Sequence, residues 1–108
     1  MNATRQREPR IENRELLDIA HEAPCFLQLG YPGCGNDKSV PCHSDELSHG
    51  RGVGNKSHDC LAVPGCPVCH AHFTRAILGR DEYRRMWAIA HAKYSVWLWA
   101  NDKIRVAA

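Results

Sequence analysis

The stretch CLAVPGCPVCH, residues 60–70, decides how this chain is expected to fold. Two residues separate Cys66 from Cys69, and a Pro-Gly pair stands directly before them. Two thiols at this spacing after a turn can face one metal ion, as they do in a zinc knuckle. A single pair is a weak signal, because redox and disulfide pairs share the spacing. The interpretation therefore depends on finding further ligands elsewhere in the chain.

A second pair of cysteines lies upstream. Eight residues separate Cys25 from Cys34, which stands within the turn YPGCG, residues 31–35. We predict that all four cysteines, Cys25, Cys34, Cys66 and Cys69, bind one structural Zn²⁺. Such a site contributes on the order of 10 kcal/mol to folding. The other two cysteines, at positions 42 and 60, lie beside apolar residues within predicted strands and are expected to be buried thiols.

The number of cysteines also bears on the cellular compartment in which the protein is expected. The chain has 108 residues, which is room for one domain, and it contains six cysteines and seven histidines. The polar N-terminus does not resemble a signal peptide, and no apolar run approaches the roughly 20 residues of a membrane span. We therefore expect a cytoplasmic protein without a membrane partner, in which cysteines bind metal. In an exported protein, three disulfides would be the better interpretation.

The remaining pattern predicts an α+β domain. Residues 1–11 are expected to form a basic polar arm, and residues 12–108 a single domain with its motif core at 25–78. Aromatic and apolar residues at steps of three and four after residue 80 predict a long helix that packs over the zinc-binding region. The predicted elements are a helix at 12–22, strands at 39–43 and 60–63, a helix at 67–78 and a helix at about 80–101.

Positive charge gathers in two places. The formal net charge is only +2, but residues 1–14 hold four arginines against two glutamates, and residues 70–93 hold five cations against two acids. Two basic regions suit a phosphate backbone. Solvated helix faces explain the same pattern equally well.

Three polar residues surround the predicted zinc site. His43 ends the first strand, Asp59 precedes the second, and His70 follows Cys69 in the first turn of a helix. This order allows His43 and His70 to face each other across a small cleft. A histidine is a workable base at neutral pH, and a second, metal-bound histidine places a divalent cation opposite it, as phosphodiester hydrolysis requires. A strand-end histidine, a capping aspartate and a histidine beside the zinc are the structural alternatives.

These residues stand in three motifs: CHSD at 42–45, HGRGVGNKSHD at 49–59 and CPVCH at 66–70. In combination they resemble the YbcO-type family of small phage and prophage nucleases. More distantly they are similar to the Ref-type RecA-dependent nuclease and to zinc-containing HNH endonucleases. The resemblance covers about residues 15–75.

The resemblance implies a zinc-stapled ββα-metal (HNH-like) fold and metal-dependent cleavage of DNA in the cytoplasm of a bacterial host. It implies His43 as the general base, Asp59 as the residue that orients it, and His70 as a ligand of a catalytic Mg²⁺ or Mn²⁺. Many HNH enzymes have a metal-binding Asp or His directly before the base, where this chain has a cysteine. Asp45, His49 and His72 are the candidates to complete the metal shell.

Nucleic-acid contacts are expected from Arg51, Lys56 and Arg75, which carry affinity without reading sequence. The glycines at 50, 52 and 54 with Lys56 are suited to holding a phosphate, although a flexible loop without a ligand has the same composition. A recombinase or another recombination protein is a further expected partner. The rival function is a non-catalytic zinc module that binds nucleic acid or such a protein. The sequence leaves the oligomeric state open.

Overall fold

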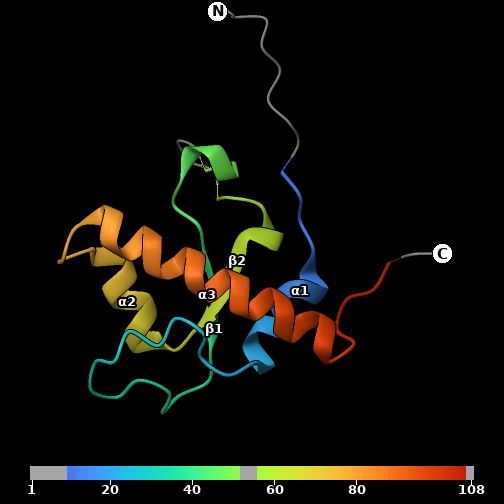
Figure 1. Ribbon diagram of the computed structural model, residues 1–108, viewed down its shortest axis with the longest axis horizontal. Helices are drawn as coiled ribbons and strands as arrows, with labels where there is room; N and C mark the ends of the chain where they lie inside the picture. Colours follow the sequence, from blue (N-terminus) through green and yellow to red (C-terminus); the bar gives the residue numbers. More distant parts are fainter. Residues whose placement is uncertain (1–9, 52–55, 107–108) are drawn as a thin grey trace, which may run out of the picture.

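The computed structural model describes residues 10–51 and 56–106 (Figure 1). The elements follow along the chain as α1 (Arg14–Glu22), β1 (Val40–His43), β2 (Ala62–Gly65), α2 (Pro67–Arg75) and α3 (Arg80–Ala100). Two short 3₁₀ helices, η1 (Leu47–His49) and η2 (Asp59–Leu61), lie between the strands. Within these residues the fold is α+β, with three α-helices and a two-stranded antiparallel sheet, as the sequence predicts.

Helix α1 begins where a side chain caps it. The Asn13 side chain accepts a hydrogen bond from the amide of Leu16 (3.0 Å), which satisfies one of the free N–H groups of the first turn. The helix therefore starts two residues later than predicted. It ends at Glu22, and Pro24 follows its cap residue. The helix buries Ala20.

The sheet pairs His43 with Ala62 and Val40 with Gly65. The prediction for the second strand is wrong in its position, because β2 begins at residue 62 and the three residues before it form η2. The amide of Leu61 donates to the carbonyl of His58 (2.9 Å) and so closes that turn. This shift of the strand alters the surroundings of Cys60. Cys42, in β1, is buried as predicted, whereas Cys60, in η2, is exposed.

Helix α2 ends earlier than its predicted limit at residue 78. Pro67 occupies its first turn, where its missing N–H leaves no hydrogen bond unmade. Ala76 follows the last helical residue with φ 50°, in the left-handed region, and its amide donates to the carbonyl of His72 (2.9 Å). Ala76 also packs against the core. The chain therefore turns here because of tertiary packing, three residues before Gly79.

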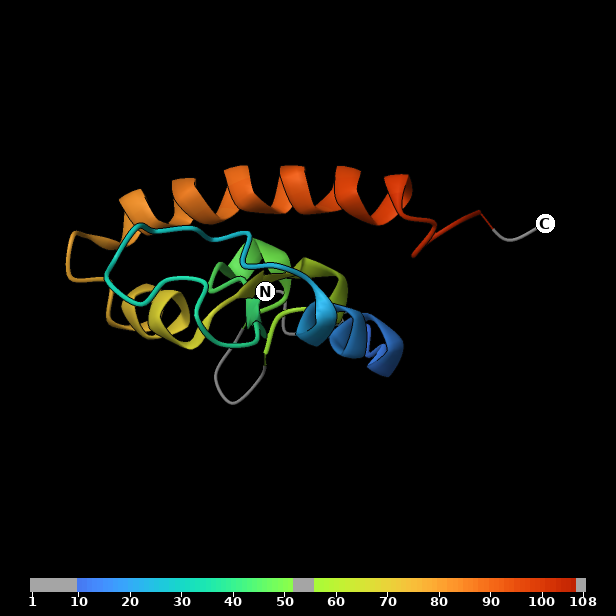
Figure 2. The same ribbon diagram turned by 90° about the horizontal axis from the view of Figure 1, so that it is seen from below.

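Helix α3 supplies one face of the core. Its buried residues are spaced three or four apart, as predicted for an amphipathic helix: Tyr83, Trp87, Ala90, Tyr94 and Leu98. Figure 2 shows α3 as one layer, and α1, α2 and the sheet beneath it. Trp97, also predicted to lie in the core, is half-buried.

The core has two parts. The first half of α3 packs against Val63 of β2, Phe73 of α2 and the four cysteines at positions 25, 34, 66 and 69. The second half packs against Ala23 and Phe26, with 5.4 Å between the ring centroids of Phe26 and Tyr94. Among the described residues, no helix is long and apolar enough to cross a membrane.

Candidate metal centre and histidine site

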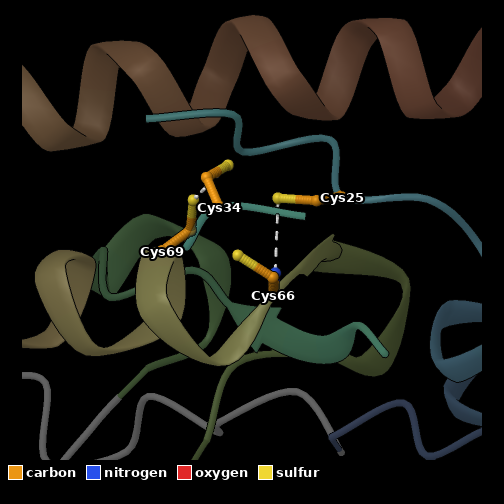
Figure 3. Close-up of side chains that lie close together, drawn as sticks. All are labelled: Cys25, Cys34, Cys66 and Cys69. Atoms are coloured by element: carbon orange, nitrogen blue, oxygen red, sulfur yellow. Dashed lines mark hydrogen bonds between the residues drawn. The ribbon is translucent and has the colours of Figure 1, made fainter. Parts of the chain in front are cut away.

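Four cysteines meet at one point beside α2 (Figure 3). The Sγ atoms of Cys25, Cys34, Cys66 and Cys69 all lie within 4.8 Å of one another, and all four thiols are free. A zinc ion about 2.3 Å from each of four thiolates holds them about 3.8 Å apart. The cluster can therefore hold a metal ion such as zinc, and the prediction that these cysteines come together is confirmed. Among the described residues, no other group of three or more His, Cys, Asp or Glu converges in this way.

Backbone amides point at the sulfurs. The amide of Cys66 donates to Sγ of Cys25 (3.3 Å), and the amide of Leu29 donates to Sγ of Cys69 (3.3 Å). Gln28 donates to Sγ of Cys25 as well (3.4 Å). Such bonds stabilise thiolates, which are the form that binds zinc. The loop around residues 25–29 and the start of α2 thus direct backbone hydrogen bonds at the sulfur atoms that would bind the metal.

The electrostatics of the cluster favour a cation once the thiols are ionised. Burial raises the pKa of Cys25 and of Cys69 above the ordinary value for a thiol. Burial opposes the ionisation of Cys66 too, but hydrogen bonds from the amides of Cys69 and Gly35 outweigh it and lower the pKa of Cys66 to about 7. Several thiolates this close repel one another, and a divalent ion between them removes the repulsion.

Two glycines leave room for the metal-binding segments to approach. A Cβ atom at Gly65 would lie 2.6 Å from Cδ1 of the buried Leu27. Gly33 has φ 90°, in the left-handed region, and a Cβ there would lie 3.3 Å from Cγ2 of Val68. A larger residue at Gly65 would push the segment that bears Cys25 away from β2, and one at Gly33 would push the turn that bears Cys34 away from α2.

A second polar site lies at the other end of the strands. His43 is the last residue of β1, and its Nε2 atom lies 2.9 Å from Oδ1 of Asp59. The side chain of Asp59 is only 3% exposed. The structure therefore brings together the strand histidine and the loop aspartate that the sequence analysis selects.

The Asp59 carboxylate is ionised despite its burial. Burial alone would raise the pKa of Asp59, but hydrogen bonds from His43 and the amide of Asn13, together with the charge of Arg10, lower it below the ordinary value. An ionised carboxylate accepts hydrogen bonds only. His43 therefore donates from Nε2, and in the neutral ring the lone pair then stands on Nδ1.

His70 lies in the first turn of α2 and is half-buried. Burial lowers the pKa of His70, and the nearby charge of His43 lowers it further. The amide of His70 donates to the carbonyl of Cys66 (2.9 Å), which ties the histidine to the cysteine cluster. The charge of His43 thus acts on His70, and the lowered pKa of His70 favours the neutral imidazole that binds metal.

The three other candidate metal ligands lie in separate contacts. Asp45 forms ion pairs with Arg80 (2.7 Å) and Arg84 (2.8 Å) of α3. The Nδ1 atom of His49 lies 2.6 Å from Oγ of Ser44. His72 stacks on the ring of Tyr31, with 3.5 Å between the ring centroids. None of these three joins His70 in a metal-binding group among the residues that the structure covers.

The predicted nucleic-acid contacts lie on the surface. Arg51, Lys56 and Arg75 are all exposed. The glycine-rich loop between the first two includes residues 52–55, which lie outside the described residues, so the predicted phosphate cradle has no structural description here.

A cavity of about 290 Å³ opens behind Asp59, between α1 and the second half of α3. Its walls include Leu16, Ala20, Tyr94 and Leu98 and are mostly apolar. His43 and His70 do not line it. Asp59 is thus the one candidate catalytic residue that lines this cavity, to which we assign no role.

Sequence analysis missed two residues at the histidine site. Arg10 and the amide of Asn13 both donate to the Asp59 carboxylate, each at 2.7 Å. Asn13 carries a detectable signal, since an asparagine before an apolar helix is a typical N-cap. Arg10 gives none, because it lies 49 residues from its partner in a segment that reads as a polar arm.

Comparison with known proteins adds nothing to these observations. No family model, curated protein or solved structure matches the chain.

Proposed function

We propose that this protein is a metal-dependent endonuclease of the HNH type that cleaves DNA. The observation that carries the proposal is the hydrogen bond between His43 Nε2 and Asp59 Oδ1, made at the edge of a two-stranded sheet that leads into α2 and His70. The order of strand, strand and helix, with one histidine on the first strand and another on the helix, is what a ββα-metal nuclease requires. The cysteine cluster anchors the start of that helix.

His43 is the general base in this proposal. Its Nδ1 lone pair accepts a proton from the water that attacks the phosphorus atom, and the resulting imidazolium is stabilised by the Asp59 carboxylate. Because Asp59 is ionised well below neutral pH, its charge is present whenever the base is in use. Asp59 also fixes which ring nitrogen carries the proton and which one faces the substrate.

In this proposal His70 supplies a neutral imidazole on the other side of the scissile phosphate. We propose that it binds a catalytic Mg²⁺ or Mn²⁺, and that such a cation, when bound, stabilises the negative charge that develops on the phosphate and the leaving oxygen. His70 is held by the first turn of α2, directly after Cys69. Its position therefore depends on the same cysteines that bind the structural metal.

DNA is the proposed substrate. The exposed side chains of Arg51, Lys56 and Arg75 are suited to contact with backbone phosphates. Such contacts would make the affinity for DNA depend steeply on salt and only weakly on sequence.

One observation favours a rival. Asp45, a candidate for the catalytic metal shell, is already paired with two arginines, and His49 is bonded to Ser44. If His70 alone does not hold a working cation, the domain is a non-catalytic zinc module that binds nucleic acid or a recombination protein. That rival requires the four cysteines and has no use for the His43 base.

The His43→Ala variant separates the two functions. We expect wild-type protein to nick supercoiled plasmid in the presence of added Mg²⁺ or Mn²⁺. We expect His43→Ala to retain its zinc and its DNA binding but to cut at least 100-fold more slowly, since a general base contributes about 10²–10⁴ in rate. His21→Ala is the matched control, because His21 is exposed and lies in α1.

The nuclease proposal fails if wild-type protein leaves both single- and double-stranded DNA intact with either ion, and if added recombinase filaments do not change this. DNA binding that persists in both variants without any cleavage would support the zinc module instead.

A further inference from the structure

A segment before α1 is bonded along the loop that carries Asp59. The amide of Ile11 donates to Nδ1 of His58 (2.8 Å), and the carbonyl of Ile11 accepts from the amide of Asp59 (2.9 Å). Arg10 donates from Nε to the carbonyl of Ser57 (3.2 Å). We call residues 10–13 the strap. The strap reaches from the start of α1 to the histidine site and forms hydrogen bonds with residues 57–59, at the start of η2.

The strap supplies most of the hydrogen bonds that Asp59 makes. Oδ1 accepts from Nη2 of Arg10 as well as from His43, and Oδ2 accepts from the amide of Asn13. The sheet register holds the backbone of His43, but Asp59 lies outside the sheet, in the first position of η2. The direction of its carboxylate is therefore set chiefly by the strap.

From these contacts we propose that Arg10 is a positioning residue for the His43 base. It holds the Asp59 carboxylate in the orientation in which Oδ1 meets His43 Nε2, so that Nδ1 faces the substrate. The inference rests on the proposed function, because it assigns a role in that same reaction.

An arginine suits this position better than a lysine. Its planar guanidinium carries five N–H donors in fixed directions, and each of its three nitrogens is used: Nε donates to Ser57, Nη2 to Asp59 and Nη1 to Glu12 (2.6 Å). A lysine offers one flexible ammonium, which can reach the carboxylate but cannot fix its angle. Because Arg10 is 29% exposed, the ion pair is partly screened, and its geometry matters more than its energy.

The test compares Arg10→Gln, Arg10→Lys and the control Arg14→Gln. Arg14 lies in the first turn of α1, and its pair with Asp18 is exposed, so Arg14→Gln removes the same charge without touching Asp59. We expect Arg10→Gln to lower kcat for plasmid nicking about tenfold with KM unchanged within about twofold, since it weakens only part of the contribution of the base. Arg10→Lys should recover part of kcat, and Arg14→Gln should equal the wild type.

A spectroscopic measurement tests the role of Arg10 without relying on DNA cleavage. In ¹H–¹⁵N spectra of zinc-loaded protein, the Nε2 proton of His43 should be observed as a hydrogen-bonded, slowly exchanging signal in the wild type and in Arg14→Gln. In Arg10→Gln it should broaden or disappear, because the carboxylate that accepts it is no longer fixed. If the glutamine variant does not fold, the same Nε2 signal is measured in Arg10→Lys instead.

The possible outcomes distinguish failure of the nuclease proposal from failure of the positioning role of Arg10. If the wild type does not cut DNA but the Nε2 signal depends on Arg10, the nuclease proposal fails, while the positioning of His43 by Arg10 stands. If the signal and kcat are unchanged in Arg10→Gln, Arg10 does not position the base. A rise in KM at constant kcat would also overturn the inference, because Arg10 would then be a contact to the substrate.

Discussion

The indole Nε1 atom of Trp87 donates a hydrogen bond to the carbonyl oxygen of Cys42, at 3.0 Å. Trp87 lies in α3 and is buried, and Cys42 is the residue before His43 in β1. A single side chain of the long helix thus fixes the strand that carries the proposed base.

Replacement of Trp87 by phenylalanine should show what this bond contributes. The smaller ring would leave part of the indole space empty, and the carbonyl of Cys42 would lose a buried donor, so the free energy of unfolding should fall by about 1–3 kcal/mol. Urea denaturation of the zinc-loaded protein measures the change. Trp99→Phe is the matched control, because Trp99 lies in the same helix and is 53% exposed. Equal effects of the two replacements would contradict the assigned role of the bond.

The purified protein should contain one zinc ion per chain. Cys66→Ser and Cys69→Ser should lose the metal and unfold, because binding of a structural zinc contributes on the order of 10 kcal/mol to folding. Atomic absorption and circular dichroism measure both effects. Cys60→Ser should retain zinc and structure, since Cys60 is exposed and lies outside the cluster. A metal-free wild type that is fully folded would show that these cysteines do not form a metal site.

Asp59 should make the stability depend on pH in the acid range. Its pKa is lower in the folded protein than its ordinary value of 3.8, so its contribution is complete above that value and is lost as the pH falls through the folded pKa. We expect Asp59→Asn to be less stable than the wild type by roughly 2 kcal/mol at pH 7, because hydrogen bonds to a charged acceptor are lost.

The difference between the two proteins should shrink as the pH is lowered below about 4, where the wild-type carboxylate takes up its proton. The comparison also cancels any acid-induced loss of metal that both proteins share. Asp37→Asn, at an exposed position, should track the wild type at every pH. A constant difference between Asp59→Asn and the wild type would mean that the charge of Asp59 is unimportant.

Ala76→Gly should stabilise the protein. Ala76 has φ 50°, a conformation that disfavours side chains by about 1–2 kcal/mol, and part of that gain is offset by the greater freedom of glycine in the unfolded chain. The net increase in the free energy of unfolding should be about 0.5–1 kcal/mol. Ala92→Gly, at an exposed position within α3, should instead lower it by about 1 kcal/mol. Parallel effects of the two substitutions would contradict the left-handed geometry at Ala76.

The sequence predicts those features that depend on local spacing. The cysteine pair at 66 and 69 follows a turn, and the apolar steps of α3 follow the period of a helix, so both are visible in short windows of residues. The meeting of this pair with Cys25 and Cys34 was predicted from ligand chemistry, because zinc requires four ligands. The structure places all four within reach of one ion.

The features that sequence reasoning missed depend on contacts between distant segments. Arg10 meets Asp59 across 49 residues, and Asp45 meets Arg84 across 39. Ala76 ends α2 although nothing in its own residue type favours a left-handed turn. The predicted second strand begins two residues early because Cys60 and Leu61 have the apolar character of a strand, while the hydrogen bond from Leu61 to His58 makes them part of a turn.

The order of the four cysteines along the chain has a consequence for synthesis on the ribosome. Cys25 and Cys66 are 41 residues apart, so the first two thiols emerge long before the other two exist. Until the start of α2 has been made, the nascent chain has only half of its ligands and cannot close the metal site. Newly made protein should therefore remain sensitive to proteases until Cys66 and Cys69 have left the ribosome and a metal ion such as zinc has been bound.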